Sequence, residues 1–214
     1  MTSTAISAQG TKLETETGSG AAKNITGIQP GFPTIITIAA HGFNGGDVLA
    51  LAGITGSIAA KLNGLSFPAT NKTTNTFAVQ VDTTGLAYTN GGTATPSAYT
   101  EVINVKSFNG FDGAASESDV TNLRSAAKEI MIGLQDFGKL SLNINPDFAD
   151  PGQGAMRAAR AASLKRWFKL TLSNGFVVAF QAFVKSMPWQ GGVDAPVEGT
   201  CELRISGDVT ITAP

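Results

Sequence analysis

The sequence predicts a mainly β protein, and three observations lead to this prediction. Residues 167–185 read WFKLTLSNGFVVAFQAFVK and place two apolar-rich runs on either side of Asn174-Gly175, a dipeptide that favours a two-residue hairpin turn. Further runs at 139–145 and 201–206 alternate apolar and polar residues with the period of a strand. Glycine makes up 25 of the 214 residues, which is typical of a chain with many turns.

The composition restricts the possible function classes. Lys and Arg number 15 against 16 acidic residues, so the formal net charge is −1, which argues against general affinity for nucleic acid or anionic membranes. The N-terminal segment lacks the basic and apolar regions of a secretory signal, and no apolar run approaches the roughly 18 residues of a membrane span. A charged fraction of only 14% fits a protein that works in an assembly, or equally a turn-rich β protein.

The first 96 residues divide by composition into two segments. Residues 1–24 are small and polar, which predicts a flexible arm with a short strand at 11–15. Residues 25–96 contain short β-branched runs separated by Gly, Asn and Pro turns, which predict a small all-β module. The lone His41 lies in this module. It has no second His or Cys for a zinc site and no serine placed for a triad, so we interpret it as a turn residue.

The next segment, 97–137, contains the most ambiguous stretch of the chain. Residues 97–108 predict one strand. In 108–137, Ser118 and Asp119 are suited to cap a helix, and apolar residues follow at helical spacing. These apolar residues are Leu123, Ala126, Ala127, Ile130 and Leu134. Taken alone the pattern predicts a helix, while the glycines at 133 and 138 leave a long folded loop as the alternative.

The remaining residues predict strands and one helix. Asp150-Pro151 is an N-cap followed by Pro at the first helical position, which predicts a helix over about 151–165. The strand at 176–184 is apolar on both faces, so we expect burial on both faces, inside a sandwich or under a neighbouring subunit. Cys201 alternates with Leu203 and Ile205 and is interpreted as a small buried hydrophobe.

The outward faces of these strands carry mixed polar and charged residues. They lack a converging acid–base pair or a cluster of metal ligands, so we expect a non-enzymatic protein without catalytic residues, metal or cofactor. The residues predicted to face water on these strands are Lys139, Ser141, Asn143, Asn145, Lys169, Thr171 and Ser173.

Two stretches resemble known families. The motifs ITGI at 25–28, AAHGF at 39–43 and TFAVQVDTTG at 76–85 resemble a small β module that recurs in phage structural proteins. The run SESDVTNLRSAAKEIMIGLQDFGKLSL at 116–142, the FKLTLSNG hairpin and GDVT at 207–210 resemble the major tail tube proteins of long-tailed, lambda-like phages.

The second resemblance implies a fold and an assembly. The fold is a tail-tube-type β-sandwich or barrel with one flanking helix, formed by 1–24 and 97–214, with 25–96 inserted and decorating the tube exterior. Homo-hexameric rings stack into a tube in the virion, DNA passes through its lumen without specific binding, and other tail proteins meet the tube ends. Such a subunit is made in the host cytoplasm.

The resemblance also assigns roles to residues. It makes 108–137 an inter-ring stacking loop rather than a helix, and it turns the water-facing strand residues toward the lumen. The predicted stacking residues are Ser118, Asp119, Leu123, Arg124, Lys128, Glu129 and Leu134. The alternative function is a soluble carbohydrate- or surface-binding β module that uses Trp189 as a contact.

Overall fold

The computed structural model describes residues 5–214, and the chain is mainly β over this range, as predicted. Its helices are α1 (Ala59–Leu62) and α2 (Pro151–Ala161). By contacts the chain forms two compact units: the first holds residues through Ile103 with 167–179 and 210–214, and the second holds 104–166 and 180–209. Strands β13 (Lys165–Thr171), β14 (Val177–Ser186) and β16 (Ala195–Thr212) have residues in both.

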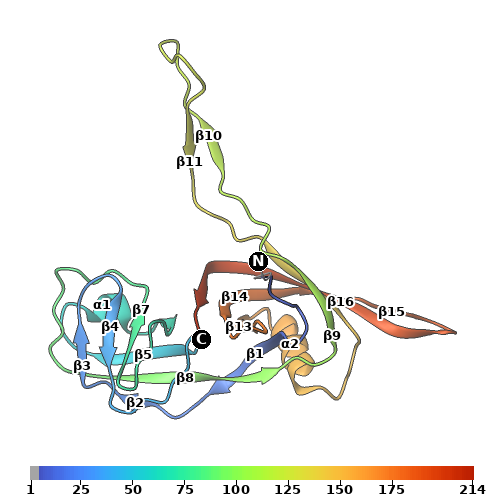
Figure 1. The fold of residues 1–214 in the computed structure, drawn as a ribbon, viewed down its shortest axis with the longest axis horizontal. Helices are drawn as coiled ribbons and strands as arrows, with labels where there is room; N and C mark the ends of the chain where they lie inside the picture. Colours follow the sequence, from blue (N-terminus) through green and yellow to red (C-terminus); the bar gives the residue numbers. More distant parts are fainter. Residues whose placement is uncertain (1–4) are drawn as a thin grey trace. The chain divides into compact units, whose positions relative to one another are not determined.

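The first unit contains two sheets (Figure 1). In one, the strand order is β6, β5, β8, β1, β13, with β2 paired to β8; in the other it is β3, β4, β7. The bounds of these strands are β1 (Lys12–Ser19), β2 (Lys23–Asn24), β3 (Gly27–Gln29), β4 (Thr34–Thr37), β5 (Val48–Ile54), β6 (Ser66–Pro68), β7 (Thr76–Val79) and β8 (Gly91–Glu101).

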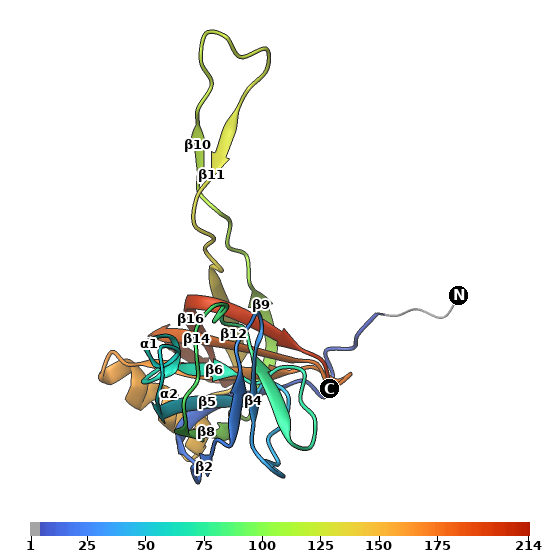
Figure 2. The ribbon, with the colours of Figure 1, turned by 90° about the vertical axis from the view of Figure 1, so that its left-hand side faces the viewer.

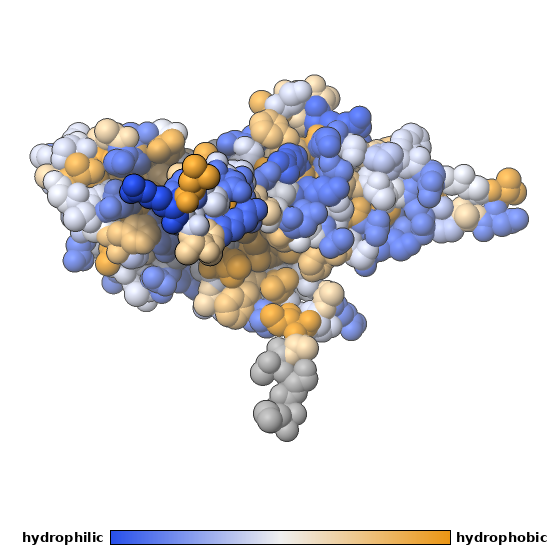
Figure 3. Space-filling model, turned by 90° about the horizontal axis from the view of Figure 1, so that it is seen from above, coloured by the Kyte–Doolittle hydropathy of each residue, from blue (hydrophilic) through white to orange (hydrophobic). Residues whose placement is uncertain are grey.

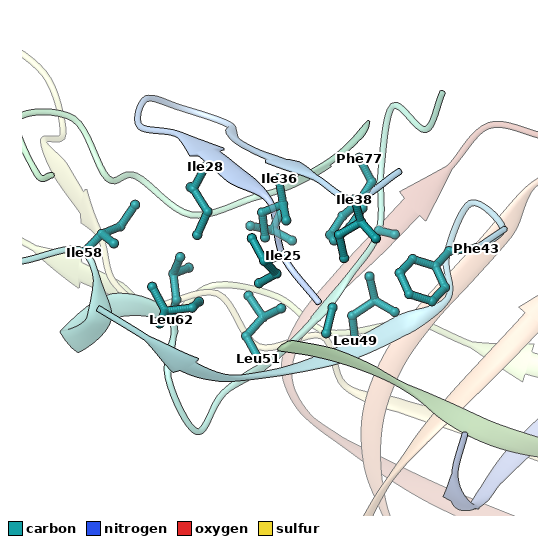
Figure 4. Packing of buried hydrophobic residues seen from close by; sticks show 14 residues of the cluster. Ile25, Ile28, Ile36, Ile38, Phe43, Leu49, Leu51, Ile58, Leu62 and Phe77 are labelled. Atoms are coloured by element: carbon teal, nitrogen blue, oxygen red, sulfur yellow. The ribbon is translucent and has the colours of Figure 1, made fainter. Parts of the chain in front are cut away.

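An apolar core joins these two sheets within residues 25–94. Figure 4 shows branched aliphatic side chains from both sheets converging with those of α1. Ile36, Leu49 and Phe77 are fully buried there. The module predicted at 25–96 therefore has a hydrophobic core of its own residues, and its status as a separate inserted domain stays a prediction.

His41 belongs to this core rather than to a solvent-exposed turn. Its Nδ1 accepts the Phe43 N–H at 3.0 Å, and its Nε2 lies 3.2 Å from the Thr76 carbonyl oxygen, to which it donates. The ring also stacks on Phe43 and meets Phe77 edge-on. Both ring nitrogens are therefore used to close the loop before β5, and His41 has a structural role.

The second unit contains a sheet and a separate hairpin. In the sheet the strand order is β14, β16, β12, β9, and β15 pairs with β16. The hairpin consists of β10 and β11 and extends away from β9 and β12 in both views (Figures 1 and 2). Strands not yet bounded are β9 (Val105–Gly110), β10 (Glu117–Asp119), β11 (Ile130–Ile132), β12 (Lys139–Ile144) and β15 (Trp189–Gly192).

Helix α2 begins where the sequence predicts and ends earlier. The Asp150 carboxylate accepts the Gln153 N–H at 2.8 Å, and Pro151 occupies the first turn. The helix ends at Ala161 instead of 165, because Ser163 adopts a left-handed φ of 52° and the Leu164 N–H returns to the Ala159 carbonyl. Lys165 already begins β13.

Two predictions, for the N-terminal segment and for residues 97–108, are corrected. Residues 12–19 are not part of a flexible arm: they form β1, which pairs with β13 on one side and β8 on the other. The predicted arm residues 1–4 lie outside the described range. The single strand expected at 97–108 is two, β8 and β9, because Asn104 turns the chain with a φ of 62°.

The helix that the pattern of 118–134 predicts does not form. The alternative, a long folded loop, describes only the residues between β10 and β11, because those two short strands pair as a hairpin. Asp119 accepts the Thr121 N–H at 2.9 Å and so makes a tight turn instead of an N-cap. The apolar positions find no surface to pack against within 5–214, and a short helix without packing is marginal in water.

Strand β14 is buried less completely than its composition suggests. Val178, Phe180 and Val184 are buried on one face, whereas on the other face Ala179 is buried and Phe183 remains 40% exposed.

Neither helix within residues 5–214 has the length and hydrophobicity that a membrane span requires.

Candidate assembly surfaces

The β10–β11 hairpin is held together by its own backbone and small turn residues. Glu117 pairs with Ile132 and Asp119 with Ile130. Beyond the strands, the Val120 N–H donates to the Glu129 carbonyl oxygen at 3.0 Å, and the Glu129 N–H donates to Thr121 Oγ1 at 3.0 Å. These contacts bring all seven predicted stacking residues onto one protruding element.

All seven of these residues are exposed, and the apolar ones fully so. Leu123 is 107% exposed and Leu134 93% exposed. The adjoining Ile130, Met131 and Ile132 are also exposed, so neither face of the hairpin is buried. Seen from the tip, hydrophilic and hydrophobic residues lie side by side on it (Figure 3).

Two charged side chains of the hairpin, Lys128 and Asp119, form an ion pair with each other. Lys128 Nζ lies 3.8 Å from the Asp119 carboxylate. Hydrogen bonds from Thr121 lower the pKa of Asp119 below its ordinary value, with a smaller contribution from Lys128. Asp119 therefore stays ionised to a lower pH than an ordinary aspartate, and Lys128 keeps a charged neighbour.

The base of the hairpin is fixed, unlike its tip. A Cβ on Gly113 would overlap the Asp136 carbonyl oxygen, so only glycine lets the two chain segments approach this closely. The Phe111 N–H donates to the Lys139 carbonyl oxygen at 2.9 Å, and the Phe111 ring meets Phe180 edge-on at 5.4 Å.

The sheet of the second unit has a polar face formed by alternate residues of its strands. On β12, Leu140, Leu142 and Ile144 are buried. The residues between them point the other way: Lys139 and Asn143 are exposed and Ser141 is half-buried, while Asn145, just after the strand, is exposed. We call this the polar face, defined by Ser107, Lys139, Ser141, Asn143, Lys185, Thr200, Glu202 and Arg204 together with Lys106 and Glu198.

Ion pairs connect the charges on the polar face. Glu202 lies 2.9 Å from Lys185 Nζ and 3.7 Å from Lys139 Nζ. Lys139 is directly opposite Arg204 in the β12–β16 register, and Arg204 pairs with Asp136. The carboxylates thus separate cations that cross-strand pairing would otherwise place side by side.

A β-bulge brings one more cation to this face. The register of β9 against β12 shifts between Asn143 and Ile144, so two residues of β9 occupy the space of one. The extra residue is Lys106, which pairs with Glu198 of β16. Bulges redirect side chains in this way.

The pKa values of two carboxyl groups reflect this pairing. The hydrogen bond from Lys185 lowers the pKa of Glu202, and the charge of Lys139 adds to the effect. The Gly138 N–H lowers the pKa of Asp136, with Arg204 as the second cause. Both carboxyl groups therefore remain ionised to a lower pH than ordinary Glu and Asp side chains do.

The predicted water-facing residues on β13 and just after it belong to the first unit. They have other neighbours than the residues of the polar face. Lys169 is half-buried: its Nζ lies 3.2 Å from Asp47, 3.5 Å from Glu14 and 4.3 Å from the Tyr99 ring centroid. Thr171 is half-buried as well, whereas Ser173, just after the strand, is exposed. The structure thus gives Lys169 fixed partners from β1 and the loop before β5, where the sequence alone predicts a water-facing side chain.

A groove of about 390 Å³ crosses the polar face. Its walls come from β9, β12, β15 and β16, and include Asn143, Gln190, Thr200 and the 62% exposed Trp189. Trp189 meets the Phe148 ring edge-on at 5.1 Å. Arg157 of α2 lies 5.3 Å from the centroid of the Phe148 ring and donates to the Phe148 carbonyl oxygen at 3.2 Å.

Sequence reasoning missed the pairing on the polar face and the Phe148–Trp189 contact. Mixed charge at alternate positions of 139–145 and 202–206 was a visible signal, but the partners depend on strand register. Phe148 had no such signal, because it lies in a loop between β12 and α2.

Comparisons with known proteins add little. No family model and no curated protein matches the chain. Among solved structures, it is similar to a chain in the virion of a native gene transfer agent particle, at 17% identity with a TM-score of 0.47, covering 54% of this chain and 89% of that one. A chain in the tail of an empty gene transfer agent particle with C6 symmetry matches at 18% identity and a TM-score of 0.47, covering 54% of this chain and 87% of that one.

Among residues 5–214, no group of three or more His, Cys, Asp or Glu is placed to hold a metal ion.

Proposed function

We propose that this protein is a structural subunit of a phage tail tube, a non-enzymatic virion protein whose hexameric rings stack around a channel for DNA. The observation that carries the proposal is the exposed hairpin at 111–137. The sequence resemblance to tail tube proteins includes the same stretch and continues through β12. Other tail proteins would meet the ends of the tube.

The hairpin is the contact between rings in this proposal. A two-stranded hairpin is marginally stable in water without further packing. Here neither β10 nor β11 has a buried residue, and Leu123 and Leu134 extend their side chains fully into solvent. An adjacent ring would supply the missing apolar surface and order the hairpin.

Edge strands of the second unit supply the contact within a ring. Strand β9 ends the strand order of its sheet, and β15 pairs only with β16 among the described strands. An open strand edge accepts a strand of another chain through backbone hydrogen bonds. Joining such edges from six copies would close the sheets into a barrel, with the polar face turned to the lumen and 25–96 on the exterior.

A concentration series of the purified protein tests the proposal. Negative-stain micrographs should show hollow filaments that lengthen with concentration. The double substitution Leu123→Glu/Leu134→Glu should leave a folded subunit that forms no filaments, because charge replaces the apolar tip. Leu65→Glu is the matched control: Leu65 is 49% exposed but lies in 25–96, so its filaments should persist.

Either of two results would contradict the proposal. One is a wild-type protein that stays monomeric at high concentration even when preformed tube fragments are added as seeds. The other is normal filaments from the Leu123→Glu/Leu134→Glu protein, which would remove the hairpin from the ring contact.

A second candidate function, saccharide binding, has one observation in its favour. The groove on the polar face combines the exposed Trp189 ring with the side chains of Asn143, Gln190 and Thr200. An aromatic face beside amide and hydroxyl groups suits a sugar ring. Calorimetric titration with a panel of oligosaccharides distinguishes the two functions, since a saccharide-binding monomer shows saturable heat that Trp189→Ala abolishes.

A further inference from the structure

The cations of the second unit's sheet share one property. Strands β9, β12, β14 and β16 carry Lys106, Lys139, Lys185 and Arg204, and each of these four side chains has a carboxylate partner. The partners are Glu198 for Lys106, Glu202 for both Lys139 and Lys185, and Asp136 for Arg204. All of these groups are on the second unit.

Such pairing has a direct consequence for a polyanion. Proteins hold DNA mainly through Lys and Arg that neutralise phosphates, and each such contact releases a counterion. A cation that already has a carboxylate neighbour gains less from a phosphate, and the carboxylate itself repels the phosphate. The side chains here are about half-exposed, so they would otherwise be accessible to DNA.

Pairing contributes little stability at such exposure. Exposed ion pairs are worth at most about 1 kcal/mol each. One carboxylate, Glu202, nevertheless serves two lysines, and a β-bulge brings Lys106 to Glu198. The arrangement is therefore better explained by its effect on the potential of the face than by its effect on folding.

We propose that Glu202 and Glu198 keep the polar face from retaining double-stranded DNA by pairing with its three lysines. The choice of DNA as the polyanion rests on the proposed tube function. The face then presents polar groups and paired charges over which a phosphate backbone moves without being held. Glu202 is the central residue because its loss exposes two ammonium groups at once.

The test is a fluorescence anisotropy titration of a labelled 20-bp duplex with the unassembled full-length subunit. The wild type should show no saturable binding at 150 mM salt. Glu202→Gln, which keeps the shape and removes the charge, frees Lys139 and Lys185 for phosphates. With two phosphate contacts its affinity should fall about twelvefold between 50 and 200 mM salt, a logarithmic slope of about −1.8.

Three further variants make the result specific. Glu101→Gln removes the same charge from the exposed pair with Lys12, which belongs to the first unit and not to the polar face, and should bind DNA no better than wild type. The double variant Glu202→Gln/Glu198→Gln frees three lysines, and its slope should steepen to about −2.7. The double variant Glu202→Gln/Lys185→Gln frees only Lys139, and its slope should be about −0.9. Thermal unfolding confirms that each variant is folded.

Several outcomes would overturn the proposal. These are saturable DNA binding by the wild type at 150 mM salt, equal binding by Glu202→Gln and Glu101→Gln, or no gain of binding in a folded Glu202→Gln protein. Because binding is measured on the unassembled subunit and filaments by microscopy, failure of this proposal and failure of the tube function are separate results.

Discussion

The module core at 25–94 and the hairpin at 111–137 use apolar residues in opposite ways. In the module, Ile36, Leu49 and Phe77 are fully buried against one another. In the hairpin, Leu123 and Leu134 contact solvent over nearly their whole surface. Both stretches alternate short strands with turns, so secondary structure alone does not account for the difference.

The comparison separates two sources of order. Burial of apolar area within the chain stabilises the module, at about 25 cal/mol per Å² removed from water. The hairpin lacks this contribution among the described residues and has only its backbone ladder and turn contacts. Its apolar residues can therefore stabilise an assembly while contributing almost nothing to the subunit.

The largest expected difference comes from truncating one apolar side chain in each region. Phe77→Ala should lower the free energy of unfolding by about 3–5 kcal/mol, because it leaves a cavity among buried neighbours. Leu123→Ala should change it by less than about 0.5 kcal/mol, since Leu123 is fully exposed. Chemical denaturation followed by circular dichroism measures both.

Filament assembly should be sensitive to the truncation that leaves the free energy of unfolding almost unchanged. Leu123→Ala should raise the concentration at which filaments appear, although the subunit is as stable as wild type. Equal losses of subunit stability from the two truncations would show that the hairpin tip packs against its own chain in solution, as the module core does.

The base of the hairpin should behave like a core. Gly113→Ala places a methyl group into the Asp136 carbonyl, so the backbone must shift, and a cost of about 1–3 kcal/mol is expected. Gly18→Ala is the control: nothing lies within 4 Å of its Cβ position, and the change should be neutral or slightly stabilising. Thermal unfolding compares the two, and equal effects would mean that the base is as loose as the tip.

Local rules predicted much of the fold because the decisive residues are close in sequence. Asn174-Gly175 correctly placed a hairpin turn, although the turn has three residues between Leu172 and Phe176 instead of the two expected. Asp150-Pro151 placed the start of α2, where the N-cap contact spans three residues. The extent of α2 was less predictable, because its end depends on the left-handed Ser163. The helix expected at 118–134 failed for a non-local reason: its apolar stripe has no partner surface within the described chain.

The candidate surfaces were predictable in type and not in detail. Alternation identified Lys139 and Asn143 as outward residues. That Glu202 serves two lysines depends on strand pairing between segments about 60 residues apart, which sequence spacing does not give. The partners of Lys169 come from still more distant segments, since Asp47 is 122 positions away in the sequence.

A smaller effect distinguishes a half-buried ion pair from an exposed one. Lys169→Met leaves the Glu14 and Asp47 carboxylates without their shared cation, and we expect a loss of about 1–2 kcal/mol of unfolding free energy. Lys12→Met removes an exposed partner of Glu101 and should cost no more than about 0.5 kcal/mol. A smaller loss for Lys169→Met than for Lys12→Met, measured by denaturant unfolding at low salt, would contradict the importance assigned to burial.

The smallest perturbation compares a thiol at each extreme of burial. Burial raises the pKa of Cys201 to about 12, and the residue is 1% exposed. At pH 8 nearly all of these thiols are therefore protonated, so a thiol reagent should leave the native protein unmodified. A Leu123→Cys protein should gain one reactive thiol at once, because position 123 is fully exposed.

If filaments bury the hairpin tip, that new thiol should become protected on assembly while Cys201 does not change. Fast labelling of Cys201 in the wild type would instead show that the second unit opens readily, and exposure of the tip would no longer distinguish the two regions.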